Sequence, residues 1–127
     1  MNTTKLILIT SGVFGGLAVL LGAFGAHGLK KIVSPEMIAV FKTGVDYQFY
    51  HAFAIALVGL SLIAQGTDPG KWLTWAFVAF AVGIILFSGS LYMLALTQLK
   101  FFGPITPLGG LCFILGWIFF TLHWIQQ

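Results

Sequence analysis

The stretch Leu6–Ala26, LILITSGVFGGLAVLLGAFGA, decides the fold of this chain. It carries no charged residue, and it is long enough to cross a hydrocarbon core of about 30 Å as a helix, which takes roughly 20 residues. It ends within Gly22–Gly28, GAFGAHG, where a histidine follows the apolar run. Lys5 in front of the run gives it some likeness to a signal peptide, but its length favours a transmembrane helix.

The composition of the whole chain points to a membrane protein. Of the 127 residues, 59% are hydrophobic and 7% are charged, whereas about a quarter of a soluble domain is charged. The net charge of +3 rests on six lysines that stand singly or as a pair between apolar runs. That placement is typical of membrane-flanking charge and argues against a nucleic-acid partner. The lone Cys112 has no internal disulfide partner, and we expect it to be a small buried residue.

Apolar runs of spanning length predict an all-α integral membrane bundle of four transmembrane helices in a single domain, residues 1–127. The predicted spans are 6–26, 45–64, 72–98 and 106–125. Their continuous hydrophobicity favours helices, because an isolated strand would leave backbone groups unpaired in lipid. Ser34-Pro35-Glu36 is typical of a helix start, and it predicts a short interfacial helix over 35–43.

Smaller signals predict the connections between these segments. Gly44 stands where a bend between the interfacial helix and the second span is expected. The composition of Gln65–Gly70 predicts a tight turn. Thr106 before Pro107 predicts the cap of the fourth helix.

Small residues follow one face of several predicted spans. In lipid, helices associate by close packing, so small residues at helical spacing indicate contacts between helices. The predicted packing residues are Gly12, Gly15, Gly16, Gly22, Gly25, Ala26, Gly109 and Gly110. The pattern leaves open whether the partner helix belongs to the same chain or to a second copy in a homo-oligomer.

Lysines are distributed unevenly between the two predicted membrane surfaces. An even number of spans puts both termini on one side, together with Lys5 and Lys71. The other side carries Lys30, Lys31, Lys42 and Lys100. Because lysine is enriched in cytoplasmic loops, the lysine-rich side is predicted to be cytoplasmic and both termini to be non-cytoplasmic.

Most polar residues of the predicted spans fall at the depth of this lysine-rich side. An ionisable group within a span is a functional-site hypothesis by default, because its desolvation is costly. Two purely structural roles compete with that hypothesis. Asp46 can pair with Lys42 at the headgroup level, and His51 can join helices by bonding Ser88, Ser90 or Tyr92. The candidate polar cluster is His27, Asp46, Tyr47, Gln48, Tyr50, His51, Ser88, Ser90, Tyr92 and Thr106.

Known catalytic and cofactor motifs do not match the chain. The glycines of Gly22–Gly28 lack the spacing and the preceding strand of a dinucleotide loop, and neither a P-loop nor a His-Glu-x-x-His motif is present. His123 is predicted at the opposite surface from His27 and His51, so a zinc site is not expected. Two alternatives remain open: haem ligation by His27 and His51, and a Ser-His-Asp triad of Ser88 or Ser90 with His51 and Asp46. Neither forms a recognised motif in a chain with so few polar residues. We expect no metal and no cofactor.

Ordered motifs along nearly the whole chain resemble a known family. These motifs are Gly22–Gly28, then Tyr47–His51 (YQFYH), Leu86–Tyr92 (LFSGSLY) and Thr106–Gly110 (TPLGG). Together they resemble domain-of-unknown-function family 423, whose members are small bacterial inner-membrane proteins with relatives in animals. The resemblance implies a four-span protein of the bacterial inner membrane whose biochemical activity is not established.

Two kinds of function therefore compete. The first is a non-catalytic bundle that interacts with membrane lipids or partner proteins, with the polar cluster holding helices together. The alternative is binding or transport of a small solute, an ion or a proton, with Asp46 and His51 as the titrating pair. A membrane enzyme using His51 as a base has the least support. The sequence identifies no small-molecule ligand.

Overall fold

The computed structural model describes residues 1–66 and 69–127. Its helices are α1 (Thr3–Ala26), η1 (Leu29–Lys31), α2 (Pro35–Gln65), α3 (Lys71–Gly83), η2 (Ile84–Ser88), α4 (Gly89–Thr97), η3 (Lys100–Phe102) and α5 (Ile105–Ile125). They group into four helical segments that are long and apolar enough to cross a membrane. The predicted all-helical, four-span fold class is therefore confirmed.

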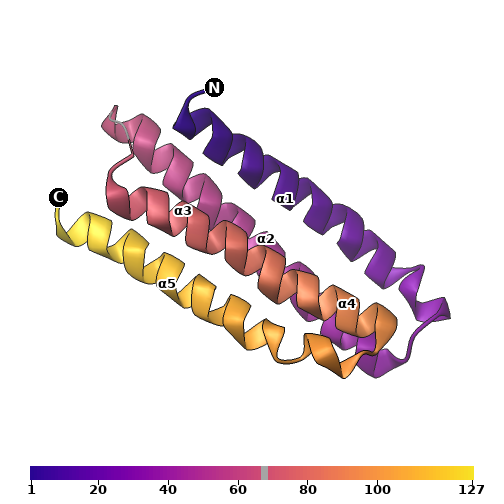
Figure 1. Cartoon of the computed structure of the whole chain (residues 1–127). Coiled ribbons are helices and arrows are strands. Elements are labelled where there is room, and N and C mark those ends of the chain that lie inside the picture. Colours follow the sequence, from indigo (N-terminus) through magenta and orange to yellow (C-terminus); the bar gives the residue numbers. More distant parts are fainter. Residues whose placement is uncertain (67–68) are drawn as a thin grey trace.

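Helix α1 lies at one edge of the bundle and packs along α2 (Figure 1). Asn2 caps it, because its side chain accepts a hydrogen bond of 2.8 Å from the backbone N–H of Lys5. The two helices run antiparallel. The side chain of Leu8 lies against Gly59 at the end of the bundle that holds the termini, and Gly25 lies against the ring of Phe41 at the opposite end. Among the described elements, α2 is the one long helix with which α1 makes extensive contact.

Helix α2 is continuous from Pro35 to Gln65. Ser34 caps it as predicted, accepting a 3.3 Å hydrogen bond from the N–H of Met37. The predicted separate interfacial helix is not seen, because residues 35–43 form the first turns of α2 and the helix continues through Gly44. Gly44 is buried against the ring of Tyr92 and marks close packing instead of a bend.

The α2 helix ends on Gly66, whose φ of 61° is the left-handed conformation that glycine adopts without strain. The predicted turn Gln65–Gly70 includes Thr67 and Asp68, which lie outside the described residues.

The third membrane segment changes its winding halfway. Helix α3 passes into a π-helical turn, η2, and then into α4. A π-turn holds more residues than an α-turn, so it rotates the faces that follow it. Accordingly α3 packs mainly on α5, whereas α4 packs mainly on α2.

Helix α5 lies at the opposite edge from α1 (Figure 1). It begins at Ile105 with Pro104 in the capping position and no side-chain cap. The prediction that Thr106 caps this helix is therefore wrong, because the Thr106 hydroxyl instead bonds Ser90 of α4 at 2.6 Å.

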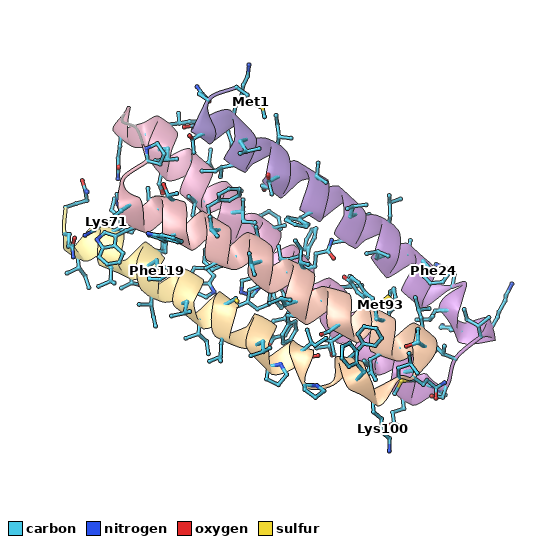
Figure 2. The ribbon with its side chains drawn as sticks, in the orientation of Figure 1. Met1, Phe24, Lys71, Met93, Lys100 and Phe119 are labelled. Atoms are coloured by element: carbon cyan, nitrogen blue, oxygen red, sulfur yellow. The ribbon has the colours of Figure 1, made fainter. Side chains whose placement is uncertain are left out.

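Both termini lie at one end of the bundle (Figure 1). Lys71 lies at that end, and Lys100 lies at the other (Figure 2). A buried apolar cluster occupies the half of the bundle nearer the termini and includes Ile7, Ile55, Val58, Leu73 and Phe80. A smaller cluster around Leu29, Phe41 and Ala95 lies at the lysine-rich end. The buried polar side chains of the candidate cluster lie between these two apolar regions along α2.

Candidate functional site

Gln48 connects three helices at the centre of the polar cluster. It is 3% exposed. Its amide N–H donates to the Phe14 carbonyl of α1 at 2.8 Å, and its amide oxygen accepts from the Tyr92 hydroxyl of α4 at 2.7 Å. A buried amide that used only one of these partners would leave a polar group unpaired in an apolar surrounding. Gln48 therefore joins α1, α2 and α4.

His51 joins α2 to α5, and its partners define its tautomer. The Trp117 indole N–H, which can only donate, lies 3.3 Å from Nε2 of His51. Nε2 therefore accepts, and Nδ1 carries the proton and donates to the Tyr47 carbonyl at 2.8 Å. The neutral ring stacks on Phe113 with centroids 3.5 Å apart and planes 5° apart. Both ring nitrogens are thus occupied inside the bundle.

The serines around the π-turn bond to neighbouring helices and to their own. Ser88 is fully buried and donates to the Gly44 carbonyl of α2 at 2.6 Å. Ser90 donates to the Phe87 carbonyl at 2.9 Å. Because that bond uses its single proton, the Thr106 hydroxyl must be the donor in the Ser90–Thr106 contact. The expected bonds from His51 to Ser88, Ser90 or Tyr92 are not formed, since the His51 ring faces α5.

Four members of the predicted cluster lie at its outer edge. Asp46 pairs with Lys42 at 2.9 Å, one helical turn earlier. Tyr50 is 58% exposed, and Tyr47 is 40% exposed while its ring packs 4.7 Å from that of Phe87. His27 is exposed, and its ring donates to the Ala23 carbonyl at 3.0 Å. This hydrogen bond holds the His27 ring against its own helix, and a role of His27 in a ligand site stays a prediction.

The predicted packing glycines divide into two groups. Gly22, Gly25 and Gly109 lie against Val45, Phe41 and Phe87 respectively, and Gly110 is in ordinary contact with Phe87. Ala26 is exposed. By contrast, a Cβ added at Gly12, Gly15 or Gly16 would meet nothing within 4 Å. These three glycines therefore make no close contact within the chain, because α1 presents to α2 an adjacent stripe: Ile7, Ser11, Phe14, Ala18 and Gly25. Contact of the open stripe with a second copy stays a prediction.

Some hydrogen bonds between the helices are not predicted by the sequence. Trp117 bonds His51. The signal available for this contact is that Phe113 and Trp117, four residues apart, share one face of a helix. His123 is 5% exposed, although it was expected at the membrane interface. It accepts from the Gln65 amide at 2.9 Å. Trp72 donates to Gln126 at 2.7 Å at the same end. No pattern in the sequence pairs these residues.

The chemistry open to the cluster is limited by these bonds. Across residues 1–66 and 69–127, every buried side-chain nitrogen and oxygen has a hydrogen-bond partner. Over the same residues no group of three or more His, Cys, Asp or Glu side chains is arranged to hold a metal. Asp46 and His51 bond different partners, so the Ser-His-Asp arrangement is not assembled. The cluster joins helices and presents neither an activated nucleophile nor a paired acid and base.

These features define a multi-pass helical membrane protein with an internally bonded polar cluster. Residues 21–110 match the family model described as "Protein of unknown function (DUF423)", and the chain belongs to this family. The family resemblance inferred from the four motifs is thereby confirmed.

Relatives extend the match over most of the chain. The UPF0382 membrane protein YwdK of Bacillus subtilis is 45% identical over 119 residues, covering 90% of this chain and 91% of its own. The UPF0382 membrane protein SAB0533 of Staphylococcus aureus is 44% identical, covering 90% of each chain. The UPF0382 inner membrane protein YgdD of Escherichia coli is 41% identical over 91% of this chain and 86% of its own. No solved structure matches the chain significantly.

Proposed function

We propose that this protein is a non-catalytic membrane bundle that binds lipid of its own membrane against the outer surfaces of its helices. The observation that carries the proposal is the complete internal bonding of the buried polar side chains over the described residues. A group that must bind a substrate or shuttle a proton needs a bonding position open to that partner. Gln48, His51 and Ser88 instead form hydrogen bonds with neighbouring helices.

Transport of a solute, an ion or a proton has less support. A transporter usually places its site near the midplane, with access from both sides. Between the polar cluster and the termini, the buried residues of α2 are apolar, and Ala54, Ile55, Val58 and Leu62 among them pack into the larger apolar cluster. Asp46, the one carboxylate in the predicted cluster, lies on the outer edge in an ion pair. These contacts favour a closed interior.

The proposed function is tested on protein purified in a mild detergent. We expect lipid of the source membrane to remain bound in a fixed ratio to protein, as quantified after organic extraction. In liposomes we expect no flux of protons or common ions above that of empty vesicles, and no change with Asp46→Asn. Complete exchange of bound lipid for detergent, or a flux that Asp46→Asn abolishes, would contradict the proposal.

We infer that the membrane is the inner membrane of a bacterium, since the Escherichia coli relative carries that description. The distribution of lysines supports both termini on the non-cytoplasmic side. A reporter that is fluorescent only in the cytoplasm, fused to either terminus, should therefore stay dark, and the same reporter inserted after Lys100 should be bright. Bright fusions at both termini would reverse the orientation.

A further inference from the structure

A cavity opens between α1 and α2 at the lysine-rich end of the bundle. Its volume is about 330 Å³, within the usual range for ligand pockets. The small residues Gly22, Gly25 and Ala26 of α1 form one wall. The other lining residues are Lys30, Ile38, Phe41, Lys42, Val45 and Asp46.

A second hollow continues this cavity toward the membrane centre. It measures about 260 Å³ and shares Gly22, Val45 and Asp46 with the first. Its remaining lining residues are Ala18, Val19, Phe49 and Tyr50. From Ala26 to Ala18 the helix rises about 12 Å, which is close to the depth of one hydrocarbon leaflet, half of about 30 Å. The two hollows thus form one apolar groove, a leaflet deep, along α1 and α2.

Both lysines of this groove lie at its mouth, and Asp46 lies where the two hollows meet. Lys30 and Lys42 line the cavity, and only Asp46 opposes them there. The Lys42 ammonium uses one of its donors on Asp46 at 2.9 Å and keeps two others. Lys30 is exposed, and the Lys42–Asp46 pair is the one ion pair found within residues 1–66 and 69–127. The mouth therefore carries a net positive charge and has donors that face the headgroup region.

We propose that this groove, which we call the α1–α2 groove, binds one anionic phospholipid, with an acyl chain along Gly22 and Val45 and the phosphate at Lys30 and Lys42. The proposal rests on the proposed function and names its site and lipid class. Basic pockets between helices on the cytoplasmic side are suited to anionic lipid headgroups. A neighbouring helix in the same place would bury two lysines, which is costly in a membrane. A lipid leaves both in the headgroup layer.

The test uses native mass spectrometry of the full chain in detergent, titrated with phosphatidylglycerol and with phosphatidylcholine of the same acyl chains. We expect one phosphatidylglycerol to bind at least fivefold more tightly than phosphatidylcholine. Ala26→Leu should weaken binding of both lipids about tenfold, because the added atoms fill the cavity. Ala23→Leu is the matched control, since Ala23 is exposed on α1 and lines neither hollow.

Adjacent lysines separate the headgroup contact from general surface charge. Lys30→Gln should lower the affinity for phosphatidylglycerol about fivefold, the loss expected for one lysine at an anionic headgroup, and should leave phosphatidylcholine unaffected. Lys31→Gln removes the same charge one residue away, where the side chain does not line the cavity, and should change little. Lys30→Arg should restore the preference. Thermal unfolding of each variant identifies any that fails to fold.

The possible failures are distinguishable. If neither lipid binds, the proposed function fails with the inference. If lipid binds without headgroup preference, or if Ala26→Leu matches Ala23→Leu, or if Lys30→Gln matches Lys31→Gln, the α1–α2 groove is overturned while lipid binding stands. If Ala26→Leu converts a dimer to a monomer without changing lipid binding, a second copy of the chain occupies the groove. That result also overturns the inference.

Discussion

Replacing Gly109 by alanine is expected to be the most damaging small substitution in the bundle. Gly109 is buried on α5 against the π-turn of the third segment. A Cβ there would lie 2.6 Å from both Cα and Cβ of Phe87, and closer still to its backbone nitrogen. Backbone cannot move aside as a flexible side chain can, so the two segments must separate. We expect a loss of about 3 kcal/mol or more, measured by unfolding in mixed detergent micelles.

Gly110 supplies the matched control one residue away. A Cβ at Gly110 would meet only the ring of Phe87, at 3.9 Å, which is ordinary van der Waals contact. Gly110→Ala should therefore be neutral or stabilising by up to about 1 kcal/mol, through helix propensity. Equal stability of the two variants would show that α5 and the π-turn do not approach each other as described.

The second large effect is expected for Gln48→Leu. Leucine matches glutamine roughly in size but removes the hydrogen bonds to the Phe14 carbonyl and the Tyr92 hydroxyl. Interhelical hydrogen bonds in membranes are worth about 0.6 kcal/mol on average. Leaving a buried hydroxyl unpaired costs about 1–3 kcal/mol more. We therefore expect a loss of about 2 kcal/mol in the same unfolding measurement.

Tyr92→Phe tests whether the loss arises from the bridge. Alone it should destabilise the bundle, because the Gln48 amide oxygen loses its donor. Combined with Gln48→Leu it should cost much less, because neither partner is then left unpaired. Additive losses would mean that the two side chains act independently. A Gln48→Leu protein that keeps its stability but loses a cellular phenotype would identify the cluster as a working site instead of a structural one.

Hydropathy was sufficient to predict the fold class, because the absence of water in the membrane leaves apolar runs few alternatives to helices. The depth of each residue follows from its position along a span, and this is why the polar residues could be collected at one end before the structure was known. The rotation of each helix does not follow in the same way. The open face of Gly12 and Gly16 and the packed face of Ser11 and Ala18 differ by a fraction of a turn, and both are rich in small residues.

The pairing of polar side chains was unpredictable for a related reason. The π-turn at Ile84–Ser88 changes the phase of everything after it in the third segment, so an ideal helix would assign the wrong faces to Ser90 and Tyr92. His51 was expected to face those residues, but its ring stacks on Phe113 of α5. The sequence also did not distinguish the partners of His27 and Thr106. The His27 ring bonds the Ala23 carbonyl, and the Thr106 hydroxyl bonds Ser90 instead of capping α5.

The row-like arrangement of the helices has a consequence for how the chain assembles. Helix α1 packs on α2, α2 on the third segment, and α3 on α5, so each long helix meets its main partner among its immediate neighbours in the chain. As the chain leaves the ribosome, α1 and α2 can pair as a hairpin before α5 has been synthesised. Local contacts of this kind favour rapid folding. The α1–α2 groove would then exist from the first hairpin onward, and a lipid could occupy it while the rest of the protein is still being inserted.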